Sequence, residues 1–170
     1  NDTATYTAAG TISATNSSSS ILIQVSGSDT DQLDNFETVN FVGSTGDDTF
    51  LINDSNDNTI DGSSESTGGD TYDTSFTNGS ILVTISDTVT AVGTAIGTDT
   101  LVDIENIVTG DGADTFVINT DVAGTYFLDA GATLGNTFEF VGSGAAEVYV
   151  TIQSDGTNDF NIASHDGTNG

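Results

Sequence analysis

The chain has 170 residues, contains no Lys, Arg, Pro, Cys, Met or Trp, and carries a formal net charge of −26 at pH 7. Nucleic-acid binding requires Lys or Arg on phosphates, an anionic membrane surface would repel the chain, and no apolar run reaches the length of a transmembrane helix. Because only His165 and the amino terminus could supply a positive charge, folding must bring carboxylates together against their repulsion, and this favours bound divalent cations.

Short alternating runs of Val, Ile, Phe and Tyr predict β-strands rather than the disorder that an acidic composition otherwise favours. Three such runs, SILIQVS at 20–26, SILVTIS at 80–86 and AEVYVTI at 146–152, resemble one another. Alternation puts every second residue of a run on one face, and we expect that face in the core. The core residues expected from the first two runs are Ile21, Ile23, Val25, Ile81, Val83 and Ile85.

The chain repeats itself with a period of about 67 residues. The segment DQLDNFETVNFVGSTGDDTFLIN at 31–53 aligns with DTLVDIENIVTGDGADTFVIN at 99–119. We therefore expect one continuous array with copies at 1–68 and 69–135 and a partial copy at 136–170. Repeat arrays need capping units, and neither end resembles one, so we expect a segment of a longer protein or ends covered by neighbouring copies.

A second, shorter spacing predicts the fold class. Large apolar residues near the Gly/Asp turns recur in steps of about nine to twelve residues, as in strands joined by turns. We expect an all-β fold, a parallel β-solenoid, because identical motifs then stack in register around an apolar column. The absence of Pro leaves every backbone amide able to donate to the next coil. Repeats that resemble β-sandwiches are the alternative.

Two acidic turns, GSTGDDTFL at 43–51 and TGDGADTFV at 109–117, resemble the nonapeptide G-G-x-G-x-D-x-U-x of the RTX (hemolysin-type) calcium-binding β-roll proteins, where U is a large apolar residue. The preceding GTDTLVDIENIV at 97–108 is similar to segments that precede such nonapeptides in large secreted bacterial adhesins. The resemblance implies calcium as the cofactor, since Ca²⁺ takes about six to eight oxygens and Gly-rich turns can supply carbonyls beside the Asp carboxylate.

The resemblance also implies individual roles by motif position. The implied metal-binding residues are Asp48, Asp114, Asp70, Gly46, Gly112 and Gly68. The implied apolar anchors beneath the turns are Phe50, Tyr72 and Phe116. Asn58 and Asn136 stand where the motif has Asp, and stacked Asn side chains can hydrogen-bond along a solenoid without metal. Solvated turns that hold no metal are therefore the alternative to calcium sites.

Glu105 recurs as Glu37 and has no basic partner, so we expect it to meet a cation or a backbone amide. Asp47 and Asp48 resemble the paired carboxylates of β-helical pectin hydrolases, but those enzymes bind anionic sugars with basic residues, which this chain lacks. His165 lies in a polar, Gly-containing stretch that is expected at the surface. We therefore expect no enzymatic activity.

The functional expectation is an extracellular structural protein, a calcium-stabilised segment of a secreted bacterial adhesin, surface layer or filament. The alternative is a non-catalytic calcium-binding module of a secreted RTX-type enzyme. The expected partners are Ca²⁺, further copies of the chain in a filament or sheet, and a cell-surface polysaccharide, with no nucleic acid and no membrane insertion.

Overall fold

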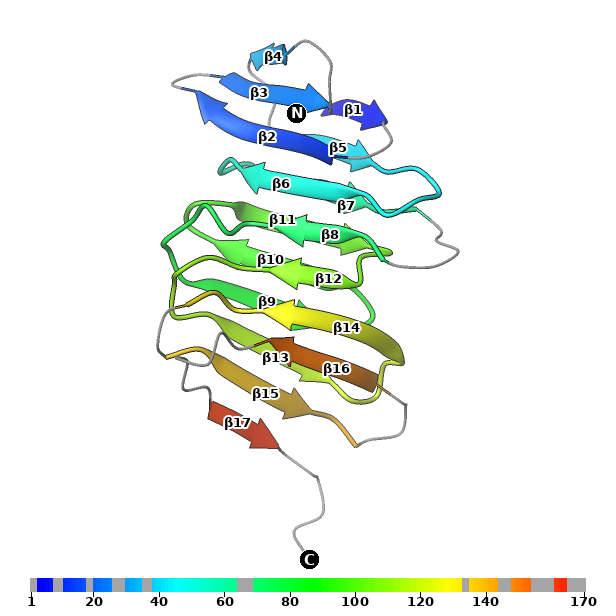
Figure 1. Cartoon of the computed structure of the whole chain (residues 1–170), viewed down its shortest axis with the longest axis vertical. Coiled ribbons are helices and arrows are strands. Elements are labelled where there is room, and N and C mark those ends of the chain that lie inside the picture. Colours follow the sequence, from blue (N-terminus) through cyan, green and yellow to red (C-terminus); the bar gives the residue numbers. More distant parts are fainter. Residues whose placement is uncertain are drawn as a thin grey trace, which may run out of the picture.

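The computed structural model describes residues 3–7, 11–17, 20–25, 30–34, 38–63, 69–132, 135–143, 148–153 and 161–164. In these ranges the chain is all-β and forms no helix, so no described segment is a helix that could cross a membrane. The strands build two sheets that lie face to face along the long axis of the molecule (Figure 1). Both sheets are mixed, with mainly parallel neighbours.

Sheet A has nine strands, in the spatial order β1 (Thr3–Thr7), β5 (Thr38–Val42), β7 (Thr59–Asp61), β11 (Gly97–Val102), β10 (Val89–Gly93), β9 (Ile81–Ile85), β13 (Thr115–Asn119), β15 (Thr137–Val141) and β17 (Asn161–Ser164). Sheet B has eight strands, in the order β16 (Val148–Gln153), β14 (Gly124–Asp129), β12 (Asn106–Val108), β8 (Thr71–Asp73), β6 (Thr49–Asn53), β2 (Thr11–Ser17), β3 (Ser20–Val25) and β4 (Thr30–Asp34).

The chain crosses from one sheet to the other after almost every strand. From β5 to β8 and from β11 to β17 it alternates between sheet A and sheet B, and the strands it lays side by side are parallel, as in β6 with β8 and β13 with β15. In Figure 1, β6, β8, β12 and β14 of sheet B point one way, and β5, β7, β13 and β15 of sheet A point the other. Two antiparallel meanders interrupt this path, β2–β3–β4 in sheet B and β9–β10–β11 in sheet A.

Equivalent turns of the two sequence copies lie on opposite edges of the molecule. The first copy runs from β1 to β7 and the second from β8 to β14, so each holds seven strands. Because this number is odd, β1 lies in sheet A and its counterpart β8 in sheet B. We name the two edges by the direction in which the chain crosses. The A-to-B edge holds the turn residues 43–48, 62–63, 69–70, 103–105 and 120–123. The B-to-A edge holds 54–58, 74–80, 109–114, 130–132 and 135–136.

The core lies between the sheets and follows the alternation of the sequence. In β5, β6 and β13 every second side chain is buried, which is the period that a strand imposes. Parallel register then stacks these side chains into columns: Val83 lies beside Phe116, and Phe116 beside Phe138, whose rings stack with centroids 4.8 Å apart. The expected anchors Phe50, Tyr72 and Phe116 are all fully buried, so this prediction is confirmed.

The alignment of the run at 20–26 with the run at 80–86 is wrong at the level of structure. The strand β3 is the middle strand of its meander, whereas β9 is the first strand of its own. The counterpart of β9 is β2, because β2 is parallel to β6 as β9 is parallel to β13. The sequence of β2, TISATNS, has few large apolar residues, so alternation could not reveal it. Burial of Ile23, Ile81, Val83 and Ile85 is nevertheless as expected.

Candidate functional site

Acidic side chains form a ladder along the A-to-B edge. Asp48 precedes β6, Asp70 precedes β8 and Glu105 precedes β12, and these three strands are neighbours in sheet B. The backbone N–H of Asp48 donates to Asp70 Oδ1 at 2.6 Å, and the N–H of Asp70 donates to Glu105 Oε2 at 3.0 Å. Each carboxylate therefore accepts the backbone N–H of the preceding acidic residue in the stack. Water cannot reach these N–H groups.

Glycine lets this edge pack closely. The N–H of Gly62 donates to the carbonyl of Val102 at 3.0 Å, and a β-carbon at Gly62 would lie 2.1 Å from Asp70 Oδ2 and 2.2 Å from the carbonyl oxygen of Asp103. Gly62 is therefore required by close approach. Gly46, which the motif places in the tight turn, is exposed, and a β-carbon there would meet nothing nearer than 3.9 Å. The sequence analysis missed Gly62 because this glycine lies outside the nonapeptide motif, whereas Gly46, the motif glycine that was singled out, does not pack closely.

The B-to-A edge carries a second ladder, built from Asp114. Its Oδ1 accepts the N–H of Ile81 at 2.8 Å, and its own N–H donates to Asn136 Oδ1 at 2.8 Å. Asn136 takes the place that an acid has on the other edge, and its Nδ2 donates to the Ala130 carbonyl at 2.8 Å. Asn136 thus hydrogen-bonds to the preceding turn through its side chain, but the other candidate for an Asn stack, Asn58, bonds the Asp54 carboxyl instead. Gly112 packs against the coil before it, since a β-carbon there would lie 2.3 Å from the Gly79 carbonyl oxygen.

Three buried oxygens on the B-to-A edge have no hydrogen-bond partner among the residues that the structure describes. One is Asn58 Oδ1; the other two, Oδ2 of Asp114 and the hydroxyl Oγ1 of Thr77, lie in adjacent turns of the stack. Burial raises the pKa of Asp114, while the Thr109 hydroxyl and the Ile81 amide act in the opposite direction. A cation would supply the missing interaction for the Asp114 and Thr77 oxygens.

The structure brings together some of the predicted metal-binding residues and separates others. Asp48 and Asp70 are adjacent on the A-to-B edge, and Asp114 lies on the opposite edge with Gly112; Gly68 is outside the described residues. Within the described ranges no three Asp, Glu or His side chains form a group that could hold a metal. As a donor set for Ca²⁺, the Asp114 turn offers one carboxylate, the Thr77 hydroxyl and backbone carbonyls, which are the hard oxygens that this ion takes.

A buried polar cluster that the sequence analysis missed lies between the sheets at the B-to-A edge. The Tyr72 hydroxyl donates to Asp99 Oδ2 at 2.5 Å, and the Asn58 N–H donates to Asp99 Oδ1 at 2.9 Å. Asn58 Nδ2 donates to Asp54 Oδ1 at 3.2 Å, and all four residues are buried. Burial raises the pKa of Asp99 to about 7, and the charge of Asp54 acts in the same direction. The recurrence of Asp31 as Asp99 was the available signal.

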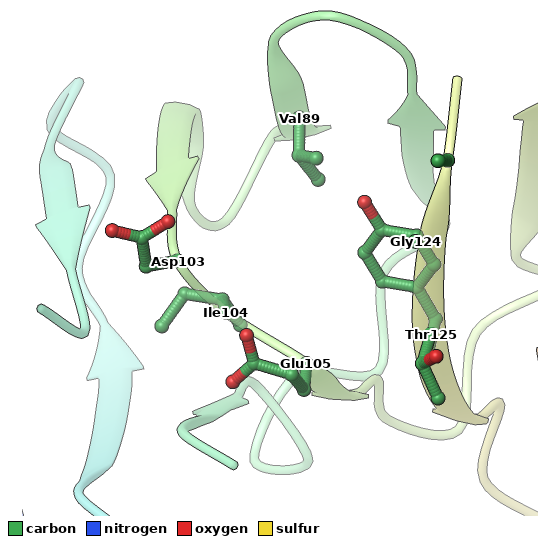
Figure 2. A pocket seen from close by; sticks show the side chains of 8 residues that line it. Val89, Asp103, Ile104, Glu105, Gly124 and Thr125 are labelled. Atoms are coloured by element: carbon green, nitrogen blue, oxygen red, sulfur yellow. The ribbon is translucent and has the colours of Figure 1, made fainter. Parts of the chain in front are cut away.

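An open pocket of about 370 Å³ lies at the A-to-B edge. Figure 2 shows Asp103, Ile104 and Glu105 on one wall and Gly124 and Thr125 on the strand opposite, with Val89 between the two walls. Ala123 and Tyr126 complete the lining. The pocket thus joins the connection before β12, the start of β14 and the hairpin between β9 and β10, and we call it the Tyr126 pocket.

Comparison with known proteins gave no match: no family model, no curated protein and no solved structure matches this chain. The functional assignment therefore depends on the geometry of the two edges and of the pocket.

Proposed function

We propose that the chain is a segment of an extracellular structural protein, a two-sheet β-solenoid that resembles RTX repeats and serves as a rod in a bacterial adhesin, surface layer or filament. The observation that carries this proposal is the path of the chain, which alternates between two sheets and, apart from the two antiparallel meanders, stacks parallel strands in register along the long axis. Side chains on both edges tie each turn to the next by hydrogen bonds to backbone amides. Such a stack is stiff, because each coil packs on its neighbours.

In this proposal Ca²⁺ binds at the Asp114 turn and not at every turn that carries the motif. On the A-to-B edge the carboxylates of Asp70 and Glu105 already accept buried amides. At the other edge Asp114 Oδ2 and Thr77 Oγ1 are buried without a donor in the described part of the chain. Those two residues, with carbonyls of the same turns, would hold the ion, which would neutralise a desolvated carboxylate in a chain that has no Lys or Arg.

The charge connects this site to an extracellular location. At low free Ca²⁺ the repelling carboxylates disfavour the fold, and at the millimolar Ca²⁺ outside a cell the ion stabilises the folded state alone. A hundredfold excess over the dissociation constant contributes about 2.7 kcal/mol per site. For a domain of this size that raises the melting temperature by roughly 5–10 °C.

Self-association belongs to the same proposal. The strands β1 and β17 end sheet A, and β4 and β16 end sheet B, so each has one neighbour within the described residues. Such strands present backbone groups that pair with another chain. Further copies of the chain are therefore the partner we propose for these strands.

Small-angle scattering and electron microscopy in Ca²⁺ test the structural role. We expect an elongated particle that associates end to end and whose melting temperature falls when EGTA is added. A monodisperse monomer with a melting temperature that EGTA leaves unchanged would contradict both parts, and would favour a module that is attached to a secreted enzyme and needs no metal.

A further inference from the structure

The Tyr126 pocket differs from the turns around it in combining carboxylates with an aromatic ring. Asp103 is exposed and Glu105 is half-buried, and they flank the buried side chain of Ile104. Figure 2 shows the Asp103 and Glu105 side chains on the wall that faces Gly124 and Thr125. We propose that this pocket binds a primary alkylammonium group, carried by a lysine side chain of another protein or by a free diamine.

The fold holds the Glu105 carboxylate in position. Glu105 Oε2 accepts the N–H of Asp70 at 3.0 Å, which fixes the side chain in the ladder of the A-to-B edge. Asp103 adopts a left-handed backbone conformation with φ of 49°, which directs the chain sharply from β11 into β12, and its side chain is exposed. Binding therefore need not order Glu105.

No Lys or Arg of the chain can neutralise these charges, because the sequence has neither residue. Burial raises the pKa of Tyr126, and the charge of Glu105 raises it further, so the carboxylate and the phenol share one electrostatic environment. A cation between them would interact favourably with the Glu105 carboxylate and with the face of the ring.

The ring occupies its place because Gly124 has no side chain. A β-carbon at Gly124 would lie 2.4 Å from Tyr126 Cε2 and 2.8 Å from the hydroxyl oxygen. The ring therefore packs directly over the backbone of β14, and any larger residue at 124 would displace it. This gives a variant that alters the pocket without changing its charge.

The lining favours an ammonium group on an alkyl chain over other ligands. A hard dication seeks about six to eight oxygens, whereas this pocket offers two carboxylates and Thr125 and is otherwise lined by Val89, Ile104, Ala123 and Gly124 beside the ring. Those apolar surfaces suit a methylene stem while the acids take the charged end. A neutral sugar would leave the charge of both carboxylates unbalanced.

The test is a titration of the ¹⁵N-labelled chain followed by amide chemical shifts. The probes are Nα-acetyl-lysine methylamide, which represents a lysine of a protein, and cadaverine, a free diamine. The norleucine analogue of the first probe lacks the ammonium group; galactose and Ca²⁺ represent the other ligand classes. We expect the amides of Glu105, Gly124 and Thr125 to shift with one or both amines and not with the norleucine analogue. The amine that binds more tightly shows whether the ammonium group comes from a lysine of a protein or from a free diamine.

Variants locate the binding. Asp103→Asn with Glu105→Gln keeps the acceptor atoms and removes both charges, and we expect it to weaken amine binding by about tenfold or more. The matched control, Asp111→Asn with Glu139→Gln, makes the same charge change outside the pocket and should change the affinity less than about twofold.

Gly124→Ala supplies an independent variant that retains both acids. We expect it to weaken binding as well, with the far-ultraviolet circular dichroism of all variants unchanged. The proposal is overturned if neither amine shifts these amides, if the norleucine analogue shifts them equally, if both pocket variants bind the amines as the wild type does, or if galactose or Ca²⁺ alone produces the shifts.

Discussion

Replacing Asp99 by Asn should remove most of the pH dependence of folding. Asp99 is fully buried, accepts hydrogen bonds from the Tyr72 hydroxyl and the Asn58 amide, and lies near the buried carboxyl of Asp54. Asn has nearly the same shape and keeps an oxygen for the Asn58 amide. The substitution therefore changes the charge of the site while its packing is retained.

The magnitude follows from the shift in pKa. Burial raises the pKa of Asp99 from 3.8 to about 7, and each pKa unit corresponds to about 1.4 kcal/mol. Because the folded state binds this proton more tightly than the unfolded state, the contribution is fully present below pH 4 and is lost as the pH rises through 7. Asp99 alone should lower the free energy of unfolding by about 4 kcal/mol between pH 4 and pH 8. Burial also raises the pKa of Asp54 and Asp114, which adds to the same trend.

The free energy of unfolding is measured by urea denaturation, monitored by circular dichroism, at a series of pH values from 4 to 8.5. The wild type should lose stability as the pH rises, opposite to ordinary acid denaturation, and Asp99→Asn should be markedly less sensitive to pH and more stable than the wild type at pH 8. The exposed control Asp111→Asn should keep the wild-type slope. If Asp99→Asn keeps that slope too, or if the wild type gains stability with pH, the reasoning about this cluster is refuted.

Two further predictions concern packing, and both are read from the free energy of unfolding in urea. Phe116→Ala should destabilise the fold by about 3–5 kcal/mol because the ring is fully buried and stacked on Phe138. The control Phe76→Ala, at a side chain that is 57% exposed, should cost less than about 0.5 kcal/mol. Gly112→Ala should cost roughly 1–3 kcal/mol because its β-carbon would meet the Gly79 carbonyl oxygen of the preceding turn, and Gly46→Ala should be nearly neutral; equal effects at the two glycines would contradict the packing described here.

The sequence predicts the core better than the edges. Alternation is a local property, so it places Ile23, Ile81, Val83 and Ile85 in the interior without knowledge of the topology, and all four are buried. The partner of Glu105 was expected to be a cation or an amide, and the amide of Asp70 is found. Local patterns of this kind survive because a strand that is buried on one face constrains its own residues.

What the sequence could not predict depends on long-range arrangement. Asp48 and Asp114 have matching motifs but lie on opposite edges because the number of strands in a copy is odd. The sequence did not reveal that number because the run that forms β2 is only weakly apolar. Tyr72 and Asp99 meet only through the register of neighbouring coils. The motif glycine at 46 is dispensable for packing, whereas Gly62, outside the motif, is not.

The most direct test of the calcium-stabilised rod is the melting temperature of the wild type and of Asp114→Asn with and without Ca²⁺. Asn keeps the acceptor for the Ile81 amide, as Asn136 does for Asp114, and removes only the desolvated charge. We predict that Ca²⁺ raises the melting temperature of the wild type, and that Asp114→Asn is more stable than the wild type in EGTA but gains little from Ca²⁺. Asp87→Asn, at an exposed hairpin, should respond as the wild type does. An unchanged calcium response in Asp114→Asn would contradict the proposed site.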